Sequence, residues 1–502
     1  MTRRFWIVLA LLAAGGGAWL WLAERRQPWT TSSPAARAEL ERGLEAEMKY
    51  YSEDARRHFQ RALELDPSFA MAKLRLLNHV PFSEKERVDE LVEELRQVDL
   101  DRLTERERFL VGYRLARADR ENARGEKTLS AYLERHPDDP YALWIRCAQN
   151  WSRNDFTAAE GCYRKLLKAD PNWVTAQNHL GYTAMAQGRF AEAEELFRTY
   201  LYVAPDQANP HDSLGELYTL TGRYADAQRE LEEALRIRPD FCASWEHLVA
   251  LANLDGDVDR AAATLARLEE VGACPKPFVK AQRCRVALWR HASTEDWDAA
   301  WGQFTELGCG EGGMGETYAL AFRAAASLGL AEEMRAMEAK MRQEVELYAS
   351  EEPGAKAGLA HLEGIRLLAK GEPQAASERL RFADENLVYW GNLQGIFKLI
   401  NRLDLADALE QAGDPAAAAA IRAEVGKVNP PLVERLAPAA GRTQLGGDDD
   451  LIDSGVLDSL GVFQLIAFLE ERFGIAIADT DITPENFGTL QRIERLVAGR
   501  AR

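Results

Sequence analysis

The chain of 502 residues is poor in cysteine and has no excess of positive charge. Six cysteines in so long a chain are too few for a disulfide framework, and none forms a C-x-x-C pair, so we expect small core residues. With 80 acidic against 62 basic side chains, the formal net charge is −18. That charge would repel a phosphate backbone and excludes nucleic acid as the main partner. The cysteines are Cys147, Cys162, Cys242, Cys274, Cys284 and Cys309.

Enzyme motifs are also missing. There is no G-x-S-x-G nucleophile turn, no G-x-x-x-x-G-K-[ST] phosphate loop and no H-E-x-x-H zinc motif. Residues 308–313 fit G-x-G-x-x-G, but no strand-like segment precedes them, so we expect a loop between helices. The 8 histidines are scattered, which predicts no metal site. The sequence therefore predicts a protein without catalytic residues of its own.

One long apolar run is present, at residues 5–23, where 19 residues carry no charged side chain. At about 1.5 Å per residue, such a helix would just cross a hydrocarbon core of about 30 Å. Arginine pairs flank the run and tryptophans lie near its ends, as in a membrane anchor. We therefore expect a single transmembrane helix within residues 1–30 and single-pass membrane localisation. The alternative is a cleaved signal peptide, although the run is long for one and no small-x-small site follows it directly.

Proline recurs at a constant interval in the first half of the chain. Pro137, Pro171, Pro205 and Pro239 lie 34 residues apart, and equal spacing of helix-ending residues indicates a repeat. The blocks resemble tetratricopeptide repeats, because residues 214–218 fit L-G-x-x-Y and residues 193–197 fit A-x-x-x-F. The resemblance implies helix pairs stacked into a right-handed superhelix.

Residue size gives this pattern a physical reason. Gly181 and Gly215 would let the first helix of a pair approach the second, and Ala193 would fill the crossing. We expect Phe197 and Leu231 to pack into the next repeat.

The repeats are expected over residues 36–430, clear to residue 240 and degenerate beyond it. In such superhelices the first helices line a groove that often holds a partner peptide. First-helix positions here carry mainly aromatic and acidic side chains, which suits a basic or amphipathic peptide or protein. The alternative is that they are ordinary packing aromatics and solvated carboxylates. The groove candidates are Tyr141, Trp144, Trp151, Asn178, Tyr182, Asp212, Glu216 and Glu246.

The pattern changes after Pro430-Pro431, where a Gly-Asp loop leads into a new domain at residues 431–502. Residues 453–461, Asp-Ser-Gly-Val-Leu-Asp-Ser-Leu-Gly, resemble the phosphopantetheine-binding acyl carrier proteins, most closely the free-standing type that includes the D-alanyl carriers. The resemblance continues through residues 470–475 and 483–487. We therefore predict an all-α chain: transmembrane helix, tetratricopeptide solenoid and carrier helix bundle.

Ser459 is the attachment residue that the resemblance implies. The same letters, Asp-Ser-Leu-Gly, occur at residues 212–215, but Ser213 lies inside a repeat helix, whereas Ser459 follows a loop and begins an amphipathic run. A phosphodiester on Ser459 would lie beside unpaired N–H groups and the positive end of the helix dipole, which favour an anion. The alternative is that Ser459 is simply a helix N-cap.

The resemblance further implies that Ser459 carries 4′-phosphopantetheine, whose thiol holds an acyl or aminoacyl group as a thioester. It implies that four nearby residues form part of the surface read by a phosphopantetheinyl transferase and by partner enzymes. Those enzymes would be an acyl- or aminoacyl-activating ligase and a membrane-proximal acyltransferase. The four residues are Asp458, Leu460, Glu470 and Glu471.

The sequence thus predicts a non-enzymatic, membrane-anchored scaffold that presents a tethered acyl group, with the repeats recruiting enzymes. The alternative is a tetratricopeptide adaptor or sensor whose carrier-like module is unmodified and only binds protein. Coenzyme A and ATP-dependent ligation belong to the cytoplasm, and the cysteines lack a pairing framework, so we expect the soluble part there. Arginine pairs on both sides of the apolar run leave the topology undecided.

Overall fold

In the computed structural model the described part of the chain is helical. It comprises residues 29–80, 84–292, 294–311, 316–348, 353–389, 391, 393–436, 465, 466, 469, 475, 477, 478 and 481–500. These residues contain no β-strand, so the helical part of the fold prediction is confirmed there. The chain divides into two compact units, Met1–Asn429 and Pro430–Arg502.

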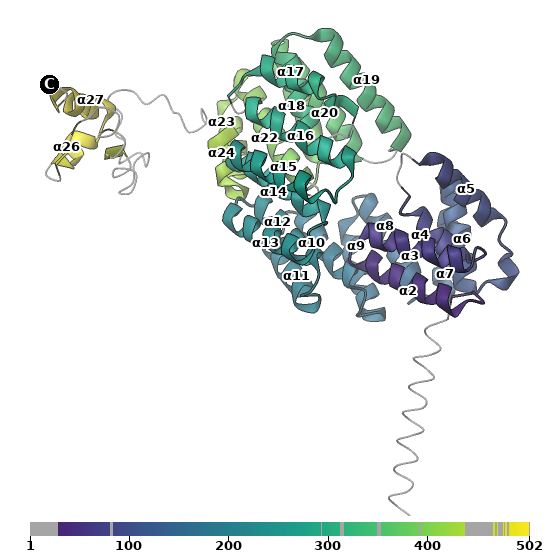
Figure 1. The fold of residues 1–502 in the computed structure, drawn as a ribbon. Helices are drawn as coiled ribbons and strands as arrows, with labels where there is room; N and C mark the ends of the chain where they lie inside the picture. The colour runs from purple at the N-terminus through teal and green to yellow at the C-terminus, as the bar shows by residue number, and fades with distance from the viewer. Residues whose placement is uncertain are drawn as a thin grey trace, which may run out of the picture. The chain divides into compact units, whose positions relative to one another are not determined.

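The first unit is a series of consecutive helix pairs (Figure 1). Short 3-10 turns occur at Leu100–Arg102 and Cys309–Glu311. The pairs are α2 Pro34–Met48 with α3 Ser52–Leu65, α4 Ala70–Leu77 with α5 Lys85–Arg96, α6 Glu105–Ala118 with α7 Asn122–Arg135, α8 Pro140–Ser152 with α9 Phe156–Ala169, α10 Val174–Ala186 with α11 Phe190–Val203, α12 Ala208–Leu220 with α13 Tyr224–Ile237, α14 Cys242–Asp255 with α15 Val258–Val271, α16 Lys276–Ala292 with α17 Trp297–Glu306, α18 Glu316–Ser327 with α19 Ala331–Tyr348, α20 Pro353–Ala369 with α21 Pro373–Asn386, and α22 Gln394–Gln411 with α23 Pro415–Val428.

The turn inside a pair follows the same 34-residue period as the prolines. The residue in the left-handed conformation is Arg120, Asn154, Gly188, Gly222 or Gly256, with φ between 59° and 86°. One left-handed residue ends a helix and lets the chain reverse, and glycine adopts that conformation without a steric penalty. The three pairs from α8 to α13 are therefore each bounded by prolines between pairs and turned by a left-handed residue within the pair.

Glycine also allows the two helices of a pair to approach closely. A Cβ added at Gly215 would lie 2.5 Å from Leu231 Cγ, and one at Gly181 would lie 2.5 Å from Phe197 Cδ1. Phe197 and Leu231 are fully buried. The close approach is as expected, and the two large side chains fill the space beside the glycine of their own pair.

Replacing Gly181 by alanine is expected to lower the free energy of unfolding by about 1–3 kcal/mol, because the new methyl group overlaps the Phe197 ring. Gly161→Ala is the matched control, since a Cβ at Gly161 in α9 meets no atom within 4 Å. It should be neutral or stabilising by up to about 1 kcal/mol, because alanine favours the helix. Urea unfolding followed by circular dichroism measures both, and equal effects would contradict this packing.

Helices far apart in sequence also touch within the first unit. The Asn429 amide donates to the carbonyl oxygens of Thr219 and Leu220, at 3.1 Å each, and the Tyr224 hydroxyl donates to Asn429 Oδ1 at 3.1 Å. From the N-terminal side, Asp54 pairs with Arg238 at 2.7 Å. The central repeats are therefore covered by segments from both ends of the unit.

The predicted transmembrane helix requires a correction. Among the residues that the structure describes, no helix combines the length and the apolar character needed to cross a membrane. The longest of them, α19 and α22, have 18 residues each, but charged side chains such as Glu338 and Asp404 interrupt both. Residues 5–23, on which the prediction rested, lie outside the described residues. Single-pass membrane localisation is therefore not supported.

Candidate functional site

The second unit is described mainly near its C-terminus, in helices α26 Pro484–Phe487 and α27 Leu490–Arg500. Helix α26 begins at the proline of the Thr-Pro-Glu sequence, and the carbonyl oxygen of Thr483 accepts from Phe487 N–H at 2.9 Å. Before them, α24 Pro430–Leu436 supplies a helix of 7 residues that ends ahead of Pro438.

A small apolar core holds the described carrier residues together. Phe487 is the most deeply buried member of this core, with only 1% of its surface exposed. The side chains of Ile482, Leu496 and Val497 pack around the core while remaining partly exposed. The buried members are Ile466, Leu469, Ile475, Ile477, Phe487 and Ile493.

The predicted attachment and recognition residues lie outside the described residues. This holds for Ser459 and for Asp458, Leu460, Glu470 and Glu471. Their roles therefore stay predictions, and the described carrier residues supply only the core of the same domain.

The second Asp-Ser-Leu-Gly sequence is fully described and lies in the middle of α12. Ser213 is completely buried, its hydroxyl donates to Asn178 Oδ1 at 2.9 Å, and its oxygen lies 3.3 Å from the Tyr182 hydroxyl oxygen. A serine in this position has no room for a prosthetic group and no accessible oxygen. The four letters alone therefore do not define an attachment site.

Three aromatic groove candidates lie on α8, and the structure places them in packing contacts. The Tyr141 ring meets the rings of Trp29 and Trp173 edge to face, at centroid distances of 5.3 and 5.1 Å. The guanidinium groups of Arg75 and Arg106 lie over the same ring. Tyr141 is thus already surrounded by side chains of its own unit.

Trp144 and Trp151 are also used internally. Trp144 meets the His179 ring edge to face at 4.9 Å, and Trp151 meets Phe156 in the same way at 5.0 Å. Burial among these rings lowers the pKa of His179 to about 4, so its imidazole is neutral at physiological pH. These contacts agree with the alternative interpretation of ordinary packing aromatics.

The polar groove candidates form one hydrogen-bonded network. Asn178 Nδ2 donates to Asn209 Oδ1 at 3.1 Å and to the Tyr50 hydroxyl at 3.3 Å. The Tyr182 hydroxyl donates to Glu216 Oε2 at 2.8 Å, and Glu216 Oε1 accepts from Leu393 N–H at 3.1 Å. Tyr50 and Leu393 come from opposite ends of the unit, so the chain itself occupies positions where a peptide was expected.

A buried ion cluster continues the network into α14. Asp212 Oδ1 accepts from the Ser244 hydroxyl at 2.7 Å and lies 3.0 Å from His247 Nδ1. His247 Nε2 lies 3.6 Å from Glu216 Oε1, and the side chains of this cluster are almost inaccessible. Burial alone would lower the pKa of His247, but Asp212 and Glu216 outweigh it and raise the pKa to about 10. Burial also raises the pKa of Glu216.

This cluster does not form a hydrolase triad. Ser244 and His247 both bind the same oxygen of Asp212, so the imidazole does not stand between serine and carboxylate as proton transfer requires. The remaining groove candidate, Glu246, pairs with Arg285 at 2.9 Å. Among the described residues, no three His, Cys, Asp or Glu side chains gather as metal ligands.

Tyr50, Ser244 and Leu393 were not among the residues predicted from the sequence, and His247 was not predicted to be an ion partner. The sequence does contain a signal for part of this network. The 34-residue period places Asn178, Asp212 and Glu246 at one equivalent position of successive repeats, and His179, Ser213 and His247 at the next position. Side chains at equivalent positions lie on neighbouring first helices and can contact one another. No local pattern marks Tyr50 or Leu393.

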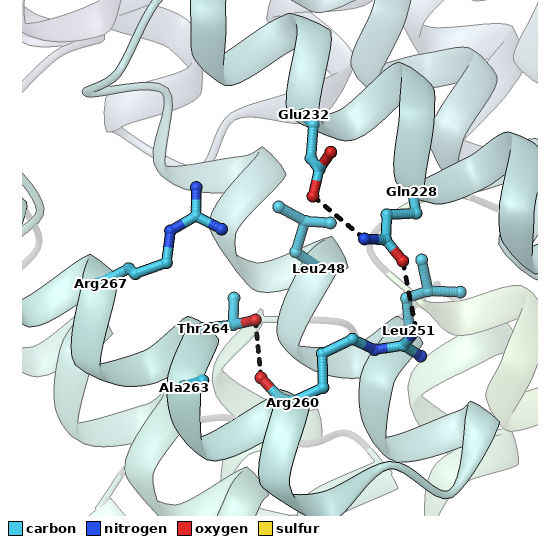
Figure 2. Close-up of a pocket in the computed structure, with 8 residues that line it drawn as sticks. All are labelled: Gln228, Glu232, Leu248, Leu251, Arg260, Ala263, Thr264 and Arg267. Atoms are coloured by element: carbon cyan, nitrogen blue, oxygen red, sulfur yellow. Dashed lines mark hydrogen bonds between the residues drawn. The ribbon is translucent and has the colours of Figure 1, made fainter.

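A small pocket of about 100 Å³ opens between α13, α14 and α15 (Figure 2). Its polar groups are bonded to one another: Arg260 donates to Gln228 at 3.2 Å, and Gln228 donates to Glu232 at 3.1 Å. The guanidinium of Arg267 lies 5.3 Å from the Trp245 ring centroid. The lining residues are Gln228, Glu232, Leu248, Leu251, Arg260, Ala263, Thr264 and Arg267.

Known protein families match segments of both units of the chain. The tetratricopeptide repeat family matches residues 174–240 and 217–276, and the family described as phosphopantetheine attachment site matches residues 431–497. The D-alanyl carrier protein of Abiotrophia defectiva is 42% identical over 53 residues, which cover 11% of this chain and 67% of that protein. This chain is a tetratricopeptide repeat protein whose C-terminal domain belongs to the phosphopantetheine-binding carrier family. That family implies a covalently bound 4′-phosphopantetheine.

Further similarities are shorter or looser. The D-alanyl carrier protein of Streptococcus suis (strain 05ZYH33) is 44% identical over 46 residues, covering 9% of the tetratricopeptide carrier chain and 58% of that relative. The chain thus spans between 58% and 67% of the length of these two carriers. The crystal structure of the APC/C hetero-tetramer Cut9-Hcn1 aligns with a TM-score of 0.44 and 15% identity, covering 86% of this chain and 81% of that chain. At that score the likeness supports no inference about function.

Proposed function

We propose that this protein carries an acyl or aminoacyl group as a thioester on 4′-phosphopantetheine attached to Ser459. The observation that carries the proposal is the match of residues 431–497 to the phosphopantetheine attachment family, together with the similarity to two D-alanyl carrier proteins. The cofactor supplies the thiol and the thioester chemistry. The chain supplies the serine that holds the cofactor and the surface that partner enzymes bind.

Two features of the described residues support Ser459 over other serines. The only other Asp-Ser-Leu-Gly serine, Ser213, is completely buried in α12. The described carrier residues form a compact apolar core around Phe487, as a folded carrier needs in order to present a modified loop. The names of the relatives point to an aminoacyl cargo, with D-alanine as the first amino acid to test.

Carrier domains imply a phosphopantetheinyl transferase and an activating ligase as partners, and tetratricopeptide repeats imply protein partners. We place the recruitment of the ligase, and of an acyltransferase that takes the cargo, on the repeat unit. Because Tyr50 and Leu393 already bond to Asn178 and Glu216, a recruited protein would bind outside these groove positions or displace those segments. The rival function is an adaptor whose carrier module stays unmodified.

Intact mass of the full chain separates the two functions. Incubation with coenzyme A and a broad phosphopantetheinyl transferase should add one group, on the order of 340 Da, to every molecule. A ligase with ATP and D-alanine should then add a second, hydroxylamine-sensitive mass. A chain of unchanged mass, alongside a D-alanyl carrier protein that is fully converted in the same tube, would favour the adaptor.

A further inference from the structure

All six cysteines of the chain lie in disulfide bonds. Cys147 pairs with Cys162, Cys242 with Cys274, and Cys284 with Cys309. This overturns the expectation that they are unpaired core residues. It also removes the cysteine argument for a reducing compartment, because disulfides persist where the surroundings are oxidising.

Each bond joins neighbouring parts of the repeat unit. The Cα atoms lie 5.3, 5.8 and 5.8 Å apart, within the range that a disulfide spans without moving the backbone. The bond from Cys147 to Cys162 links α8 to α9 inside one helix pair. The separations of 15, 32 and 25 residues follow the helix pairs, and so no C-x-x-C or framework spacing appears in the sequence.

Two of the bonds lie where the repeat pattern is weak. Cys242 is the first residue of α14 and Cys274 follows α15, so this bond links the two ends of the pair. Helices α14 and α15 also line the small pocket. Cys284 in α16 is bonded to Cys309 just after α17. Cross-links that close such loops restrict the unfolded chain and thereby favour the folded pairs. The bonds therefore support the part of the solenoid after Pro239.

We propose that the repeat unit matures in an oxidising compartment and that the holo chain has one free thiol, the thiol of its prosthetic group. Each bond forms when two cysteine thiols pass two electrons and two protons to a thiol–disulfide oxidant, whose own disulfide becomes a dithiol. The second half of the proposal rests on the proposed carrier function, whereas the first half does not. Because coenzyme A is an intracellular metabolite, a chain oxidised outside the cytoplasm must receive its prosthetic group first.

The pairing has a chemical consequence for the cargo. A thiolate is the nucleophile that would remove an acyl group from a thioester, and a cysteine in a disulfide has no thiolate. With every cysteine paired, no thiol of the same chain can accept the cargo. The acyl group is therefore available to a partner enzyme without loss to a cysteine of the same chain.

Thiol trapping in the cells that make the protein tests the first half. Cells are quenched in acid, free thiols are alkylated in denaturant without reductant, and the full chain is weighed. We expect no alkylation of the six cysteines, and peptide mapping should find the pairs 147 with 162, 242 with 274, and 284 with 309. Alkylated cysteines or different pairs would overturn the proposal.

The second half is tested on the purified oxidised chain before and after treatment with coenzyme A and transferase. Alkylation should add no label to the untreated chain, one to the treated chain, and none to a treated Ser459→Ala chain. Label on the untreated chain would overturn the pairing. A treated chain that gains neither phosphopantetheine nor label, with all three disulfides intact, would overturn the carrier function and the single-thiol claim while leaving the disulfides established.

Discussion

Substituting Ser459 by alanine should abolish the addition of phosphopantetheine completely. The transferase forms a phosphodiester on a serine hydroxyl, and alanine offers no oxygen for that bond. The expected loss is all or none, and it removes every later step, since the cargo is held on the cofactor thiol. Intact mass after incubation with coenzyme A and transferase measures it, and circular dichroism should show an unchanged helix signal.

Ser213→Ala is the matched control because it lies in the same four-letter sequence, Asp-Ser-Leu-Gly. Ser213 is completely buried and bonded to Asn178, so its loss should lower stability modestly, by about 1 kcal/mol, without changing the added mass. Modification that survives in Ser459→Ala would disprove the assigned residue. Loss of modification in a folded Ser213→Ala chain would disprove it equally.

His247→Asn should destabilise the repeat unit by about 3–5 kcal/mol near pH 6, because it leaves Asp212 and Glu216 buried without their cation. Asparagine can still donate to Asp212 as His247 Nδ1 does, so the loss reports mainly on charge. His58→Asn is the control: His58 pairs with Glu39 at 2.8 Å, but its side chain is 36% exposed, and an exposed pair contributes less than about 1 kcal/mol.

The pH dependence of this effect has a definite sign. The folded pKa of His247 is about 10, above its ordinary value of 6.5, so its charge contributes stability fully below pH 6.5. That contribution is lost as the pH rises through about 10. Burial raises the pKa of Glu216 as well, so ionising this carboxyl in the folded state also costs stability as the pH rises.

The difference in unfolding free energy between the natural chain and His247→Asn should therefore shrink from pH 6.5 toward pH 10. Urea denaturation at a series of pH values measures it. A difference that stays constant across this range, or that grows with pH, would contradict a protonated His247 in the fold.

The helix pairs could be predicted because their determinants are local and periodic. The 34-residue spacing of Pro205 and Pro239 indicates the repeat directly. Gly181 and Gly215 indicate where the two helices of a pair cross closely. Beyond Pro239 the sequence no longer follows the repeat pattern closely, but the helix pairs continue, and two disulfides lie in this part of the chain. A disulfide depends on which helix faces meet, and sparse cysteines at irregular spacing do not reveal that.

The closure of the groove could not be predicted for a related reason. The contact between Leu393 and Glu216 joins residues 177 positions apart, and that between Tyr50 and Asn178 joins residues 128 apart. Such contacts depend on how the pairs accumulate curvature along the solenoid, which no short motif records. Aromatic and acidic first-helix residues look the same whether they bind a foreign peptide or the chain's own segments.

The carrier domain was recognisable for the opposite reason. The resemblance to carrier proteins rests on a short continuous segment, residues 453–461, which can be recognised without knowing which helices pack together. The family match at residues 431–497 agrees with that local signal. The individual roles of Asp458, Leu460, Glu470 and Glu471 depend on surface geometry and remain predictions.

The most direct test of the carrier function is tandem mass spectrometry of the Ser459 peptide from protein isolated from its own cells. The cells should be quenched at mildly acidic pH, where thioesters last, and digested without added thiols. The account predicts phosphopantetheine on Ser459, with part of the population carrying an acyl or aminoacyl mass that hydroxylamine removes. A peptide in which Ser459 is unmodified in every copy would contradict it.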